Sequence, residues 1–299
     1  MALPRLLQIP RFVRFGVRVD TAPEWLWLAL LAAALWPTWW WMGQRMRDGS
    51  DDPLGLLALA ALGVLVWRQR QLLRPAPRLR WLALALAGAV AATVLRESLP
   101  PLAGALIALL ALAAGLVAFL PPRVATAPVL GLSVLSLPLL ASLQFYAGYP
   151  LRVLTAEASR WLLALQHDVA RSGSSLLVNG QLVIVDAPCS GVQMVWLGYF
   201  TACVVALHGG AAHRHAHFSN RRFLMRLPAV SVLVLTGNVL RNTVLVAAQA
   251  ADWQLPAWAH DAVGLVVLAA VCGGIGWVMG RDGGRNGHER HSGEQHAYV

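Results

Sequence analysis

Three residues in the C-terminal half of the chain have side chains suited to acyl-transfer chemistry. Cys189 stands in the stretch APCSG, Arg241 in GNVLRNTVLV and His260 in WAHDAVG. A cysteine thiolate is a nucleophile, a histidine can accept and return a proton, and an arginine can stabilise a negatively charged oxygen. This chemistry requires a fold that brings the three residues together, because they are far apart in the sequence.

Each residue alone also has a simpler interpretation. A cysteine at the start of a helix is often a small buried hydrophobe, and an interfacial histidine beside Asp261 could be solvated. Arg241 could hold a helix bundle together by pairing with a carbonyl, although an arginine inside an apolar span costs about 2.5 to 3.5 kcal/mol and usually faces a functional cavity. For Cys189, a helix N-terminus and a nearby cation would favour the thiolate.

The elements that must position these residues are predicted from the composition. The 299-residue chain is 58% hydrophobic and 13% charged, with a mean hydropathy of +0.58, which is typical of a membrane protein. Apolar stretches of spanning length recur, so we predict an all-α polytopic membrane protein with about eight transmembrane helices. The expected spans lie near residues 25–42, 54–67, 81–95, 102–120, 128–146, 190–208, 227–249 and 257–279.

The basic residues indicate the orientation of these spans. All 24 are arginines, and the formal net charge of the chain is +10. Most lie before the first span, between residues 68 and 80, at 123, between 214 and 226, and after residue 280, whereas the alternate loops hold few. By the positive-inside rule, both termini are expected in the cytoplasm of a multi-pass inner (plasma) membrane protein. The expected partner of the basic loops is therefore the lipid bilayer and not nucleic acid.

The segment from Gly148 to Pro188 is then expected on the extracytoplasmic side. Residues 152–173 carry apolar side chains at helical spacing, which predicts an amphipathic helix at the interface. Two apolar runs flank Asn179-Gly180, which predicts a β-hairpin that completes a small extracytoplasmic cap. Because Arg241 falls in the outer half of the seventh span and His260 at the start of the eighth, both are predicted near Cys189 at one membrane face.

At these motifs the chain resembles the exosortase/archaeosortase family of membrane transpeptidases. The resemblance covers roughly residues 128–280, with three motifs in the family's order on successive spans. It implies that Cys189 is the nucleophile, Arg241 the stabiliser of substrate or oxyanion, and His260 the acid/base. Gln193 stands shortly after the cysteine, where the family often has a basic residue. Further candidate substrate-binding residues are Asp186, Ser190, Gly191 and Asn242.

The resemblance further implies a function, that of a membrane-embedded cysteine protease or transpeptidase. The expected substrate is a membrane-anchored protein with a C-terminal sorting signal, made of a short motif, one transmembrane helix and a basic cytoplasmic end. The thiolate would cleave it on the extracytoplasmic side through a thioacyl intermediate that passes to an amine or to water. Within the chain we expect N-terminal transmembrane helices in residues 1–127, a catalytic membrane region in 128–280 and a disordered cytoplasmic tail in 281–299.

No cofactor is expected, and no metal site. His208, His213, His215 and His217 are interpreted as part of a solvated cytoplasmic loop, because they lack cysteine or carboxylate partners. The other two cysteines, Cys203 and Cys272, lie in the middle of spans and are interpreted as packing residues.

Two other functional classes stay open at this point. A transporter or channel would use Arg241 for an anionic substrate, but repeat symmetry or paired broken helices would then be expected. A non-catalytic membrane assembly protein would keep Arg241 for packing and would not need a reactive thiol.

Overall fold

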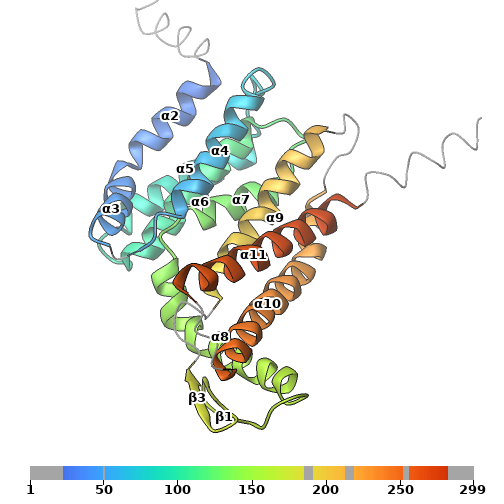
Figure 1. The fold of residues 1–299 in the computed structure, drawn as a ribbon. Coiled ribbons are helices and arrows are strands. Elements are labelled where there is room, and N and C mark those ends of the chain that lie inside the picture. The colour runs from blue at the N-terminus through green and yellow to red at the C-terminus, as the bar shows by residue number, and fades with distance from the viewer. Residues whose placement is uncertain (1–22, 50, 185–190, 213–218, 252–255, 282–299) are drawn as a thin grey trace, which may run out of the picture. The chain divides into compact units, whose positions relative to one another are not determined.

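The chain folds into helices and one small sheet (Figure 1). The computed structural model describes residues 23–49, 51–184, 191–212, 219–251 and 256–281. The elements in chain order are α2 (Glu24–Ala34), α3 (Trp36–Arg47), α4 (Gly55–Gln69), α5 (Leu79–Val94), α6 (Pro101–Phe119), α7 (Thr126–Leu135), α8 (Leu140–Leu163), β1 (Val169–Ser172), β2 (Ser175–Val178), β3 (Gln181–Ile184), α9 (Val192–Ala212), α10 (Asn220–Ala250) and α11 (Ala257–Gly280).

Two compact units divide the chain. Unit 1 consists of residues 1–39 and 67–121, and unit 2 of residues 40–66 and 122–299. In unit 1, α6 packs against α5 and α2. Small residues make these contacts close: a Cβ added at Gly88 would lie 2.8 Å from the Cβ of Ala111, and one at Gly115 would lie 2.6 Å from Leu31 Cδ2. Such small-residue contacts are typical of helices packed within membranes.

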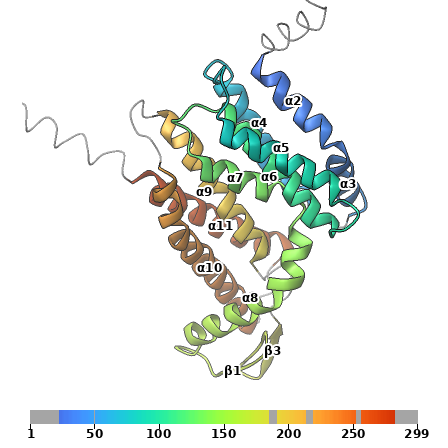
Figure 2. The same ribbon diagram turned by 180° about the vertical axis from the view of Figure 1, so that it is seen from behind.

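Helix α9 is the centre of unit 2. It packs against α7, α8, α10 and α11, and both views show α9, α10 and α11 side by side (Figures 1 and 2). Trp196 of α9 is fully buried and its indole N–H donates to the carbonyl oxygen of Leu135 at 3.1 Å, so the polar end of this large side chain has a partner. Cys203 is buried in the same core, as expected for a packing residue.

The break between α7 and α8 differs from the sequence-based expectation of one span over residues 128–146 and a separate amphipathic helix after it. Instead α7 ends at Leu135, the chain bends by 93°, and α8 continues through Pro150 to Leu163. Pro138 lacks the N–H needed to continue α7. The carboxylate of Asp51 accepts a hydrogen bond from the backbone N–H of Ala141 at 3.2 Å, which caps the new helix.

The cap expected from the sequence corresponds to the C-terminal half of α8 and a three-stranded antiparallel sheet of order β1-β2-β3. The predicted hairpin is confirmed: β2 and β3 flank Asn179-Gly180, whose φ angles of +50° and +85° suit a tight two-residue turn. Strand β1 was not predicted. The sheet packs on α8 and α10 through a small apolar cluster that includes Leu176, Val178, Val183, Ala156 and Val246.

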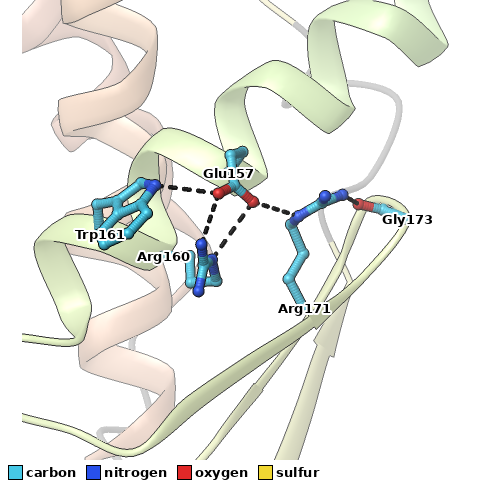
Figure 3. Close-up of polar contacts among 5 residues, drawn as sticks. All are labelled: Glu157, Arg160, Trp161, Arg171 and Gly173. Atoms are coloured by element: carbon cyan, nitrogen blue, oxygen red, sulfur yellow. Dashed lines mark hydrogen bonds and ion pairs between the residues drawn. The ribbon is translucent and has the colours of Figure 1, made fainter.

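A cluster of charged side chains also ties the sheet to α8 (Figure 3). The carboxylate of Glu157 accepts hydrogen bonds from Arg160 at 2.6 Å, from the indole of Trp161 at 3.0 Å and from Arg171 of β1 at 2.5 Å. Arg171 in turn donates to the carbonyl oxygen of Gly173 at 2.7 Å. The cluster therefore links the first strand and its turn to the preceding helix.

Each expected span coincides with a helix or a pair of helices, but the lengths differ from the expectation. Within the described residues, three helices are long and apolar enough to cross a membrane: α6, α10 and α11. The bent pair α7 and α8 would make a fourth. The other apolar helices are shorter, so eight spans are not confirmed. The 15 residues of α4, for example, reach only about 22 Å, less than the ~30 Å of a hydrocarbon core.

Candidate active site

A cavity of about 310 Å³ opens among α9, α10 and α11 within unit 2. Most of its lining is apolar, while Gln193, Arg241 and Asp261 bring polar groups to it. A concave apolar site with a few polar groups is the usual form of a small binding site. The lining residues are Gly191, Gln193, Met194, Leu197, Arg241, Asp261, Gly264, Leu265 and Leu268.

Arg241 reaches this cavity from α10. The side chain is half-buried and its Nε atom is fully buried. Along α10, Arg241 precedes Gln249, near the C-terminal end of the helix, by about 12 Å of helix rise. Its guanidinium packs over Gly264 of α11, where an added Cβ would come within 3.2 Å of Nε. Because residue 264 is a glycine, there is room beside α11 for the guanidinium of Arg241.

Gly191 forms the turn that leads into α9. Its φ of +80° is a left-handed conformation that favours glycine, and its carbonyl oxygen accepts the N–H of Val195 at 2.8 Å as α9 begins. A Cβ added there would lie 2.6 Å from Cγ of Asn238 on α10. Residue 191 therefore requires glycine for two reasons, its backbone conformation and its contact with α10.

A buried polar network holds Asn238 in place. Its amide donates to the hydroxyl of Thr155 on α8 at 2.9 Å, and both residues are almost fully buried. The amide of Asn242, one turn further along α10, donates to the backbone oxygen of Asn238 at 2.8 Å. Because buried polar groups that are hydrogen-bonded rigidify their surroundings, this network fixes the wall of α10 against which Gly191 packs.

His260 lies in the first turns of α11. It precedes Gly264 by four residues, which places it on the same face of α11, one turn from the point where Arg241 packs. It is half-buried and does not itself line the cavity.

The predicted site residues thus fall into three groups. Arg241 and Gly191 line one cavity, and His260 lies one helical turn from the Arg241 contact. Asn242 packs within the polar network of α10 and is not part of the lining. The remaining predictions concern positions outside the described residues: Cys189, Asp186, Ser190, His213, His215, His217 and the tail after Arg281.

Sequence reasoning missed Asn238, Thr155 and Gly264. A signal existed for Gly264, since it follows His260 at helical spacing, but none for the pairing of Asn238 with Thr155, which are 83 residues apart. No group of three or more His, Cys, Asp or Glu side chains suited to a metal ion occurs within the described residues.

The chain was compared with models of protein families. The family model described as transmembrane exosortase (Exosortase_EpsH) matches residues 40–277, which is most of the chain. The chain belongs to the transmembrane exosortase family. The match begins well before residue 128, so the resemblance to exosortases extends further toward the N-terminus than the three motifs indicated. Comparison with curated proteins and with solved structures gives no significant match.

Proposed function

We propose that this exosortase-family protein is a cysteine transpeptidase that cleaves membrane-anchored proteins at a C-terminal sorting signal on the extracytoplasmic side. The observation that carries the proposal is the shared cavity: Arg241 lines it together with Gly191, which follows Cys189 by two residues in the chain. His260 lies on α11 one turn from the Arg241 contact.

In the proposed reaction the Cys189 thiolate attacks the carbonyl carbon of a peptide bond. Arg241 stabilises the resulting oxyanion, because its fixed N–H donors act in an apolar cavity where they need no reorganisation. The C–N bond then breaks, His260 supplies a proton to the leaving amine, and a thioester remains on the sulfur. An incoming amine or water then attacks the thioester, His260 takes up its proton, and the C–S bond breaks to release the Cys189 thiolate.

The proposed substrate follows from the same site and its surroundings. Its recognition motif would enter the cavity, its single transmembrane helix would lie in the bilayer, and its basic end would remain in the cytoplasm. The cavity walls include helices α10 and α11, both long and apolar enough to span the membrane, so substrate and site would meet at a membrane surface.

The nucleophile is tested by changing each cysteine in turn. Cys189→Ala is expected to abolish processing of co-expressed secreted proteins that carry a C-terminal motif, helix and basic end, while the protein stays inserted and folded. Cys203→Ala and Cys272→Ala are matched controls that should cost packing energy only, because Cys203 is buried and Cys272 contacts Thr201 within the bundle. Substantial processing by the Cys189→Ala protein would overturn the proposal.

A further inference from the structure

A loop that is distant in sequence reaches the wall of the cavity. Asp52, between α3 and α4, accepts a hydrogen bond at 3.0 Å from the amide Nε2 of Gln193, which lines the cavity 141 residues later. Its neighbour Asp51 anchors the loop: the side chain of Asp51 is fully buried, caps α8 at Ala141 and lies 3.8 Å from Arg45. Asp52 is therefore held in a fixed position beside Gln193.

The carboxylate determines how the amide of Gln193 is turned. An ionised carboxylate only accepts hydrogen bonds, so the amide must direct its NH₂ group toward Asp52. Its carbonyl oxygen, Oε1, is then directed away from Asp52 and is available as an acceptor at the cavity wall. The hydrogen bond to Asp52 thus sets the orientation of the amide, with its acceptor oxygen on the side away from the carboxylate.

A hydrogen-bond donor complements this acceptor elsewhere in the cavity lining, because the guanidinium of Arg241 can only donate. The same lining contains Met194, Leu197 and Leu268, which are apolar. An extended peptide carries an N–H donor and a C=O acceptor at each residue, with side chains alternating between its two faces. Its chemistry complements the cavity, with a carbonyl oxygen toward Arg241 and an N–H toward Gln193.

We propose that Gln193 binds a backbone N–H of the peptide substrate through Oε1, and that Asp52 is a positioning residue that fixes the orientation of this amide. This inference rests on the proposed function of the same cavity. It assigns to Gln193 a role in holding the substrate in register.

The test compares two kinds of reagent at Cys189. A panel of N-acetyl dipeptidyl chloromethyl ketones with apolar side chains would label the thiol through the cavity, while iodoacetamide would label it with almost no binding contacts. Gln193→Met keeps the side-chain length and removes the amide. It is expected to lower the labelling rate by the dipeptidyl reagents roughly five- to tenfold, the effect of one lost hydrogen bond, and to leave the iodoacetamide rate unchanged.

Two further comparisons separate binding from folding. The backbone nitrogens of the dipeptidyl reagent are methylated one at a time. At one position methylation should lower the labelling rate of the unaltered protein by a similar factor, and it should cause no further loss in Gln193→Met.

The second comparison changes Asp52. Asp52→Ala should lower the rate of dipeptidyl labelling, whereas Asp52→Asn should retain most of it because the amide oxygen still accepts. Asp52→Ala should have no added effect in Gln193→Met. Glu97→Ala, which changes an exposed carboxylate in unit 1, is the matched control.

The outcomes are distinct. A parallel fall in both labelling rates for Gln193→Met, or an N-methylation loss that persists in that variant, would overturn the inference. Absence of dipeptidyl labelling with normal iodoacetamide labelling would also overturn it, while leaving the thiol chemistry in place. Absence of both in the unaltered protein would overturn the proposed function, and the inference with it.

Discussion

At the scale of single residues, the most informative side chain is Arg241. Its position inside an apolar stretch of the sequence indicates a functional cavity, because an unneeded charge there is costly. The structure adds the reason that the charge can be accommodated: Gly264 of α11 leaves room for the guanidinium, and the cavity gives it an opening.

Substitutions of Arg241 separate catalysis from packing. Arg241→Lys keeps the positive charge but loses the planar set of donors and shortens the reach, so we expect turnover to fall by roughly a hundredfold or more, with little change in expression. Arg241→Leu removes the charge altogether and should be at least as inactive per folded molecule. The measurements are activity per folded molecule and the rate of Cys189 alkylation. Near-normal specific activity in the leucine variant would mean that Arg241 only holds helices together.

Residue-level prediction was limited by contacts between distant segments. The types of Cys189, Arg241 and His260 predict acyl-transfer chemistry from sequence alone, and these roles stay a prediction. The sequence did not show why residue 191 must be glycine. The reason is its close contact with Asn238, which is hydrogen-bonded to another helix. Asp52 is a similar case, since nothing local in its loop indicates a partner 141 residues away.

At the scale of elements, local sequence patterns predicted the β2–β3 hairpin but not strand β1 or the start of helix α8. Asn179-Gly180 is a strong turn signal, and the strands around it formed as expected. Strand β1 has only four residues, three of them exposed, so it lacks the alternating apolar pattern that identifies a strand. The early start of α8 depends on a cap from Asp51, 90 residues from Ala141, which no local pattern could show.

The stability that the interactions of Glu157 with Arg160 and Arg171 give to the contact between α8 and β1 should depend on pH. Hydrogen bonding from Arg160, with a further contribution from Arg171, lowers the pKa of Glu157 from 4.5 to about 2. Because the pKa is lower in the folded state, this interaction stabilises the fold fully above about pH 4.5 and is lost as the pH falls toward 2. The melting temperature in detergent of Glu157→Gln should therefore lie below that of the unaltered protein at pH 7, and the gap should close in acid.

The control for this prediction is Glu97→Gln, which changes an exposed carboxylate that makes no ion pair among the described residues. It should leave the melting temperature unchanged across the same range. A gap for Glu157→Gln that stays constant as the solution is acidified would show that the ion pairs with Arg160 and Arg171 do not contribute to stability.

At the scale of the whole molecule, composition was enough to indicate a membrane protein, and the motifs were enough to indicate the family. The number of spans was harder to predict, because apolar stretches in the sequence do not show where helices end. Helices α4 and α5, with 15 and 16 residues, reach about 22 and 24 Å. Helices of this length can cross a bilayer only if it thins locally or if flanking residues extend to the interface.

Reporter fusions on either side of α5 test whether a short helix of this kind crosses the membrane. The arginines between residues 68 and 80 favour the cytoplasm for the loop that contains Ala76, so a fusion there should give a cytoplasmic reading. A fusion at Ser98, between α5 and α6, should give an outer reading if α5 spans the bilayer. The same reading at both positions would mean that α5 does not cross.

The orientation of the C-terminal half is the last prediction, and the proposed site depends on it. The distribution of arginines predicts that both termini lie in the cytoplasm and residues 148–188 outside, so reporter fusions at Ser174 and at the C-terminus should give opposite readings. Matching readings would require an even number of crossings between these two points, whereas α9, α10 and α11 would make three. The cavity could then not face the outer side while the basic end of the substrate stays in the cytoplasm, and the proposed cleavage could not occur there.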